Sequence, residues 1–161
     1  MSANEQAQRA AGERSGRARI LVVEDNPLNR LLLLDILELR GHEVVEASSV
    51  DEALPLLDAA RLDLLLLDVQ IPGGGGEAVV KEVRKRAALV DLPIVAVTSL
   101  AMPGDRERLL GSGFQGYLSK PIDTRTFGPT VEGFLRRPTA ARANGHEAID
   151  DSTVEARRRA R

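Results

Sequence analysis

Four short apolar stretches of this 161-residue chain are each followed at once by side chains that can bind a cation or a phosphoryl group. These residues are Glu24 and Asp25, Asp68, Thr98, and Lys120. If the apolar stretches are parallel strands, their carboxyl ends lie at one edge of a sheet, and these side chains converge there. Three neighbouring carboxylates repel one another unless a cation neutralises them, and oxygen ligands without Cys or His suit Mg²⁺. A Lys ammonium and a Thr hydroxyl beside that metal would complete a cradle for phosphoryl oxygens.

The elements that must position these residues alternate between short apolar runs and amphipathic segments, a pattern typical of βαβ units. The expected strands cover residues 20–23, 44–45, 64–67, 94–97 and 117–118. The first, third and fourth are continuously apolar, as expected for parallel strands that helices cover on both faces. The expected helices cover residues 27–40, 49–60, 76–89, 103–111 and 123–136.

Two of these helices carry clear local signals. Asn26 before Pro27 is typical of a helix start, and Ser49 with Glu52 three residues later forms a capping box. Pro55 conflicts with the second helix, because a proline inside a helix removes one backbone hydrogen bond. We therefore expect a kink there.

Composition excludes several classes of protein. The net charge is −2, from 22 Lys and Arg against 24 Asp and Glu, so no basic field attracts nucleic acid or a membrane surface. The chain has no Cys, its two His lie 104 positions apart, and three Phe and one Tyr are too few for base stacking. No apolar stretch is long enough to span a bilayer. The sequence predicts a cytoplasmic protein with one domain, residues 18–137, between a flexible tail, 1–17, and a disordered tail, 138–161.

The order of the motifs resembles a known family. The segments 20–26, 64–73, 97–98 and 117–121 are similar to those of the receiver domain of two-component response regulators, which is CheY-like, and the similarity spans about 120 residues. Among receivers, the chain resembles most the small single-domain regulators of the DivK type. The resemblance implies an α/β fold with a doubly wound, five-stranded parallel sheet in the order 2-1-3-4-5 and five helices.

The resemblance also implies roles for the residues that converge. Asp68 matches the phosphoacceptor, and Glu24 and Asp25 match the acidic pair that holds Mg²⁺. Asp68 and the backbone carbonyl of Gln70 would be the other protein ligands of the metal. Lys120 matches the lysine that contacts the phosphoryl group.

Further positions match the family's switch and its hydrolytic path. Thr98 and Tyr117 match the switch hydroxyl and the switch aromatic residue, and Pro121 matches a proline whose preceding bond is commonly cis. Gln70 and Leu100 would flank the path of the hydrolytic water. Because Leu100 cannot orient a water by hydrogen bonding, the resemblance implies slow self-dephosphorylation.

One loop departs from the family pattern. Pro72 is followed by four glycines, Gly73–Gly76, where the family has an apolar residue and an Asp before the last glycine. Since glycine raises the conformational freedom of the chain, we expect a looser loop beside the site. No Gly-Lys-Ser/Thr follows, so the run does not indicate a nucleotide-binding loop.

These features predict a single-domain response regulator. It would accept a phosphoryl group on Asp68 from a sensor histidine kinase or a phosphotransfer protein with Mg²⁺, rather than act as an enzyme on a separate substrate. The 24 residues after Arg137 are too few for an output domain, so the signal would pass by protein contact. A receiver-like scaffold that works without phosphorylation is one alternative. A Mg²⁺-dependent aspartyl-phosphate phosphatase is another, disfavoured because Gln70 stands where such enzymes need a second acid.

The expected contact surface involves the fourth helix, the fifth strand and the fifth helix. It would present arginine and aromatic anchors to a downstream protein or a second copy of the chain, through Arg106, Arg108, Leu109, Tyr117 and Phe127.

Other charged residues have simpler interpretations. We expect His42 to be exposed at a helix end, and the basic run 84–86 to lie on the solvated face of the third helix.

Overall fold

Five parallel strands form one sheet in the order β2-β1-β3-β4-β5, as the resemblance predicts. The computed structural model describes residues 16–59, 61–99 and 102–136. The strands are β1 (Arg19–Val23), β2 (Glu43–Ala47), β3 (Leu64–Leu67), β4 (Ile94–Thr98) and β5 (Gly116–Ser119). Each apolar run predicted from the sequence lies within one of these strands.

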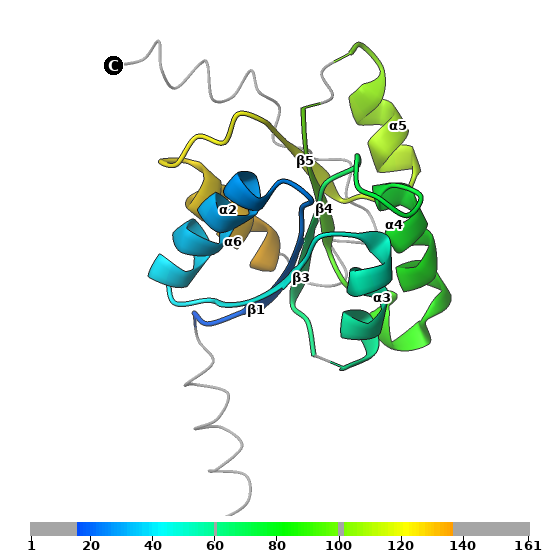
Figure 1. The fold of residues 1–161 in the computed structure, drawn as a ribbon, viewed down its shortest axis with the longest axis horizontal. Coiled ribbons are helices and arrows are strands. Elements are labelled where there is room, and N and C mark those ends of the chain that lie inside the picture. Colours follow the sequence, from blue (N-terminus) through cyan, green and yellow to red (C-terminus); the bar gives the residue numbers. More distant parts are fainter. Residues whose placement is uncertain (1–15, 60, 100–101, 137–161) are drawn as a thin grey trace, which may run out of the picture.

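Helices cover both faces of the sheet (Figure 1). They are α2 (Pro27–Leu39), α3 (Val50–Ala59), α4 (Gly76–Lys85), α5 (Asp105–Gly111) and α6 (Phe127–Leu135), with a short 3₁₀ turn, η1 (Ala87–Leu89), after α4. Helices α2 and α6 lie on one face, and α3, α4 and α5 on the other. None of the helices in the described part of the chain is long and apolar enough to cross a membrane.

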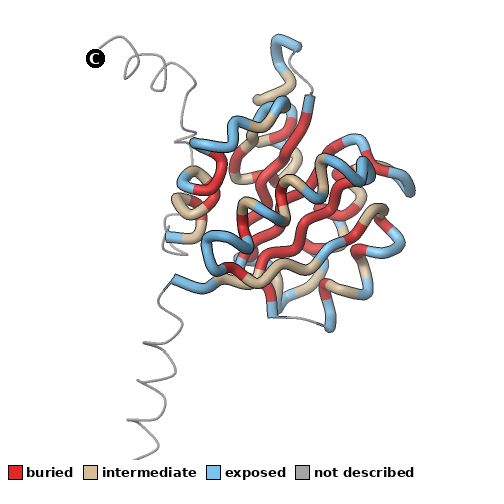
Figure 2. Tube along the Cα trace, turned by 60° about the vertical axis from the view of Figure 1, so that its left-hand side comes forward, coloured by how far each residue is buried: buried red, intermediate tan, exposed pale blue. Residues whose placement is uncertain are grey.

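The central strands are buried on both faces (Figure 2). All four residues of β3 are buried, and alternate side chains enter two separate cores. Leu65 and Leu67 pack with α3, α4 and α5, whereas Leu64 and Leu66 pack with α2 and α6. Double-sided burial explains why this strand reads as an uninterrupted apolar run.

Two helices differ from the lengths expected from the sequence. Helix α4 ends at Lys85 instead of continuing to Leu89, because Arg86 is extended (φ −93°, ψ 114°) and the chain resumes as η1. Helix α6 begins at Phe127 instead of residue 123. Asp123 forms a turn before it, with its side chain accepting from the N–H of Arg125. Helix α3 runs through Pro55 over ten residues.

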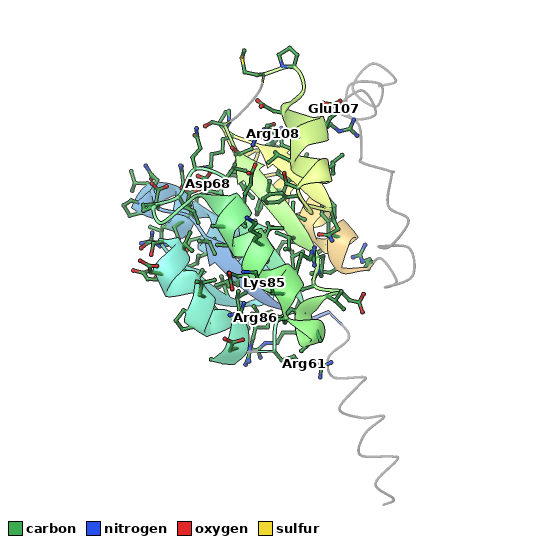
Figure 3. The ribbon with its side chains drawn as sticks, turned by 90° about the vertical axis from the view of Figure 1, so that its right-hand side faces the viewer. Arg61, Asp68, Lys85, Arg86, Glu107 and Arg108 are labelled. Atoms are coloured by element: carbon green, nitrogen blue, oxygen red, sulfur yellow. The ribbon has the colours of Figure 1, made fainter. Side chains whose placement is uncertain are left out.

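The basic run at the end of α4 is less exposed than expected. Lys85 is exposed, and it lies with Arg86 at the end of the helix away from Asp68 (Figure 3). Arg84 instead turns inward and donates to backbone carbonyls, and Arg86 pairs with Asp58 of α3 at 2.8 Å. The expectation of a solvated face was wrong for Arg84.

His42 is also buried, contrary to the expectation of an exposed residue. Its Nδ1 accepts from the N–H of Ala18 at 3.2 Å, and its Nε2 lies 3.2 Å from Glu132 Oε1 of α6. Arg40 donates to both oxygens of the same carboxylate, at 2.7 and 2.8 Å. The sequence places Glu132 far from both partners, so no local pattern indicated this cluster.

The cluster predicts a loss of stability in acid. The Arg40 hydrogen bonds lower the pKa of Glu132 from 4.5 to about 2, against the opposing effect of burial and with a further contribution from His42. A lowered carboxylate pKa stabilises the fold above the unfolded-state pKa and loses this effect as pH falls toward 2. Between about pH 5 and about pH 3, urea unfolding should therefore show the unmodified chain losing about 1 kcal/mol more than Glu132→Gln, after allowance for solvent screening. Equal losses in both chains would contradict this assignment.

Candidate functional site

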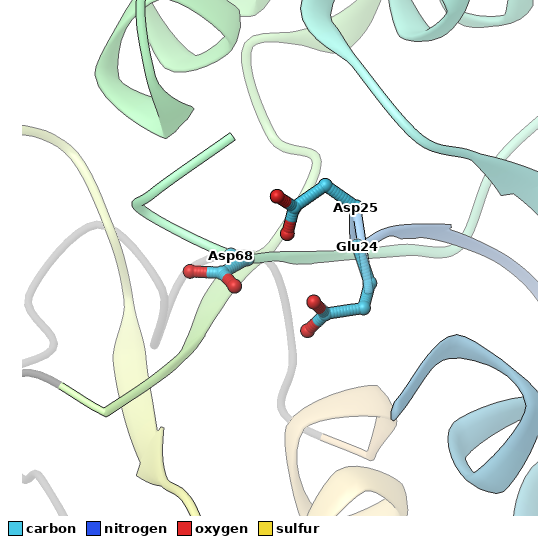
Figure 4. Close-up of side chains that lie close together, drawn as sticks. All are labelled: Glu24, Asp25 and Asp68. Atoms are coloured by element: carbon cyan, nitrogen blue, oxygen red, sulfur yellow. The ribbon is translucent and has the colours of Figure 1, made fainter. Parts of the chain in front are cut away.

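The carboxyl ends of β1 and β3 bring three carboxylates together (Figure 4). Glu24, Asp25 and Asp68 each place a carboxylate oxygen within 4.8 Å of the others. Lys120, which follows β5, joins them with Nζ 2.7 Å from Asp68 Oδ2 and 2.6 Å from Glu24 Oε2. The structure thus assembles residues from three loops at the sheet edge where the sequence predicts them to converge.

Backbone hydrogen bonds fix the loop that carries the acidic pair. The N–H of Glu24 continues the sheet by donating to Ala47 O at 3.0 Å, and the N–H of Asn26 donates to Glu24 Oε1 at 3.1 Å. Arg30 of α2 donates to the carbonyl of Glu24 at 2.8 Å. Sequence reasoning missed Arg30, and its place as the fourth residue of the helix after the acidic pair is the signal that could have found it.

Asp68 is held from both sides. Its N–H donates to Val23 O at 2.9 Å, which ties it to the end of β1, and its Oδ1 accepts from the N–H of Gln70 at 2.9 Å. The Asp68 residue is only 5% exposed, yet its second oxygen faces the Lys120 ammonium. This leaves a carboxylate that is fixed in orientation and shielded from bulk water.

The glycine run after Asp68 follows a defined path that other residues could not adopt. Gly73 has a φ of +98°, and a Cβ there would lie 2.9 Å from Val50 Cβ. Gly76 begins α4 so close to the site that a Cβ would lie 2.6 Å from Asp68 O. Its N–H donates to Val69 O at 2.8 Å. The run therefore packs closely at both ends, with Gly73 against Val50 of α3 and Gly76 against the backbone of Asp68, and the expected looseness of the loop stays a prediction.

Lys120 is positioned by the neighbouring strand. Its N–H donates to Thr98 O at 2.9 Å, and the peptide bond between Lys120 and Pro121 is cis. Burial alone would lower the pKa of Lys120, but the hydrogen bond to Asp68 and the negative charges of Asp68 and Glu24 outweigh it, so the pKa is raised. The ammonium therefore stays charged between the two carboxylates.

Glu24 has an unusual environment for a carboxylate. Burial raises the pKa of Glu24, although Lys120 and the N–H of Asn26 act in the opposite direction. Its Oε2 is buried, and the Lys120 ammonium approaches it from a direction that is not that of a hydrogen bond. Among the described residues, this oxygen therefore has no directed donor.

The donor set fits a divalent cation. Three carboxylates offer oxygen atoms only, one of these atoms is buried without a directed donor, and Mg²⁺ is the hard cation that such ligands suit. The resemblance adds the carbonyl of Gln70 as a ligand, and Gln70 lies next to the site through its hydrogen bond to Asp68.

The predicted switch residues lie on adjacent strands. Thr98 ends β4 and is fully buried, and Tyr117 of β5 is half-buried against the same core as α5. In the sheet register, Thr98 pairs with Ser119 and Ala96 pairs with Tyr117. Leu100, the remaining site candidate, lies outside the described residues.

The expected contact surface is smaller than the sequence suggested. Leu109 and Phe127 are 0% and 4% exposed and belong to the two cores, so they are not surface anchors. An apolar residue on one face of a short helix can pack into the core or form part of an interface. The sequence alone did not distinguish these two possibilities for Leu109 and Phe127. Arg106, Arg108 and Tyr117 remain accessible on α5 and β5.

Comparison with known proteins identifies the family. Residues 20–131 match the response regulator receiver domain. The chain is 39% identical over 116 residues to the polar-differentiation response regulator DivK of Brucella anthropi and to that of Brucella abortus, covering 72% of this chain and 94% of each relative.

Solved structures agree with this match. A putative response regulator from Chloroflexus aurantiacus superposes with a TM-score of 0.71 at 29% identity, covering 75% of this chain and 99% of that one. Chemotaxis response regulator CheY4 of Vibrio cholerae has a TM-score of 0.70 at 30% identity, covering 73% and 98%. The receiver domain of the sensor histidine kinase PA1611 from Pseudomonas aeruginosa, which has a magnesium ion in its active site cleft, has a TM-score of 0.69 at 29% identity, covering 74% and 98%. The resemblance seen in the sequence is confirmed, and the chain belongs to the response regulator receiver domain family.

Proposed function

We propose that this receiver accepts a phosphoryl group on Asp68 from a phosphohistidine of a sensor histidine kinase or a phosphotransfer protein. The observation that carries the proposal is the convergence of Asp68 with Glu24, Asp25 and Lys120 at one sheet edge. A family member with this donor set is a phosphoacceptor in signalling, so we do not propose turnover of a separate substrate.

In this mechanism, an Asp68 oxygen attacks phosphorus and forms an O–P bond, while the P–N bond to the donor imidazole breaks and the imidazole leaves with the electron pair. Asp68 Oδ1 is held by the N–H of Gln70, which orients the carboxylate before attack. Lys120 already lies 2.7 Å from Asp68 Oδ2, where its charge can stabilise the incoming phosphoryl oxygens.

Glu24, Asp25, Asp68 and the carbonyl of Gln70 would hold Mg²⁺. When bound, the metal would neutralise part of the negative charge of the three carboxylates and the phosphoryl group. The magnesium ion in the related PA1611 receiver supports this assignment.

The signal would leave the site through Thr98 and Tyr117. A phosphoryl group adds acceptor oxygens next to β4, which can draw the Thr98 hydroxyl inward and open space for the Tyr117 ring. The accessible part of α5, β5 and α6 would then meet a downstream protein or a second copy of the chain. This route is supported by the full burial of Thr98 and the partial burial of Tyr117 on the adjacent strand.

The direct test is incubation with acetyl phosphate and Mg²⁺, followed by intact-mass spectrometry. We expect one phosphoryl group per chain, and none when Mg²⁺ is removed by a chelator, because the carboxylates then repel the donor. A chain that stays unmodified with Mg²⁺ present would contradict the proposal and favour a scaffold that works without phosphorylation.

A further inference from the structure

The start of α4 is in direct contact with the peptide that carries Asp68. Gly76 packs so closely that a Cβ would lie 2.6 Å from Asp68 O and 3.0 Å from Val69 Cα. The N–H of Gly76 donates to Val69 O at 2.8 Å. Since packed backbone transmits displacement, a shift of the Asp68 peptide must move the first turn of α4.

The next residue of this turn connects to another helix. Glu77 Oε1 accepts a hydrogen bond from Arg108 Nη1 of α5, and the two side chains form an ion pair. Figure 3 shows Arg108 on the side of α5 nearer to Asp68. One short chain of contacts therefore runs from the phosphoacceptor candidate to α5.

Helix α5 is lightly anchored, which makes this ion pair important for its position. Of its seven residues, all of them described, only Leu109 is buried. The helix begins after Gly104, which has a φ of +91° and no atom within 4 Å of the place where a Cβ would lie. A helix with few buried contacts has a low local stability, so little free energy is needed to move it.

We propose that the Glu77–Arg108 ion pair is a latch that holds α5 in its position in the unphosphorylated receiver. The proposal rests on the proposed function, because it assigns the latch a role in the response to a phosphoryl group on Asp68. Movement at Asp68 acts on Glu77 through Gly76, and release of Arg108 frees α5 and presents an arginine to a partner. This connection is separate from the route through Thr98 and Tyr117.

The latch makes a measurable prediction without a known partner. An interaction present in only one of two conformations biases the equilibrium, and linkage requires that its loss strengthens binding of any ligand that selects the other conformation. Beryllofluoride with Mg²⁺, a non-covalent phosphoryl analogue, is such a ligand for Asp68. Glu77→Gln and Arg108→Gln should each bind it about two- to fivefold more tightly than the unmodified chain, the range that an exposed ion pair can supply.

Binding would be measured by calorimetric titration, with hydrogen exchange of the α5 amides as a second readout. The double variant Glu77→Gln/Arg108→Gln should match either single variant, and the charge exchange Glu77→Arg/Arg108→Glu should restore the original affinity. Exchange in α5 should be faster in the two single variants than in the unmodified chain.

Asp58→Asn provides the matched control, because it breaks the ion pair of α3 with Arg86 at the other end of α4. It should leave beryllofluoride affinity unchanged. Unchanged or weaker binding in the Glu77 and Arg108 variants, or the same gain in Asp58→Asn, would overturn the latch. Failure of the unmodified chain to bind beryllofluoride would instead overturn the proposed function.

Discussion

Replacement of Asp68 by Asn should reduce phosphoryl incorporation from acetyl phosphate by more than about a hundredfold, because an amide is not a nucleophile toward phosphorus. The substitution keeps the shape of a side chain that is 7% exposed, so the fold should remain. It also removes a negative charge that lies 2.7 Å from Lys120. Intact-mass spectrometry after a fixed incubation with Mg²⁺ measures the loss directly.

Asp35→Asn is the matched control for this prediction. Asp35 is an exposed residue of α2, so this variant makes the same change from Asp to Asn away from the site. It should incorporate one phosphoryl group at the original rate. Undiminished incorporation in Asp68→Asn would place the modified residue elsewhere, and peptide mapping would then locate it.

The sheet and the site could be predicted because their signals are local. The run 64–67 is apolar at every position since helices cover both of its faces, and the polar residue that follows marks the end of the strand. Asp68 therefore indicates both the end of the strand and a candidate site. Convergence with Lys120 follows from parallel topology alone, which fixes the edge at which strand ends meet.

Contacts between distant segments could not be predicted in this way. No local sequence pattern around His42 indicates that its partner is Glu132, which lies 90 residues further along the chain. The burial of Leu109 and Phe127 could not be predicted from the sequence either. An apolar residue on a short helix suits a core or an interface equally well, and only the packing of the whole domain assigned both residues to the core.

Arg84 is the residue for which sequence reasoning and structure differ most. In the sequence it belongs to a basic run that suggests solvent, but its guanidinium reaches three carbonyls between α4 and β4, those of Leu89, Val90 and Leu92, at 3.1 to 3.4 Å. It also donates to Gly113 O at 3.0 Å, 29 residues away. Burial lowers the pKa of Arg84, with Asp91 acting in the opposite direction, yet a guanidinium remains charged.

Arg84→Met should therefore destabilise the fold by about 2–4 kcal/mol in urea unfolding, because hydrogen bonds from a charged donor contribute about 1.5–3 kcal/mol each and several act together here. Lys85→Met is the control from the same basic run. Lys85 is exposed and pairs with Glu82 on its own helix, so its loss should change stability by no more than about 0.5 kcal/mol. Arg84→Lys should recover only a small part of the loss, since a single ammonium cannot reach both ends of the fork that Arg84 spans. Equal stability of Arg84→Met and Lys85→Met would contradict this prediction. It would mean that water satisfies the carbonyls of this turn as well as the guanidinium does, and that Arg84 contributes no more to stability than an exposed residue.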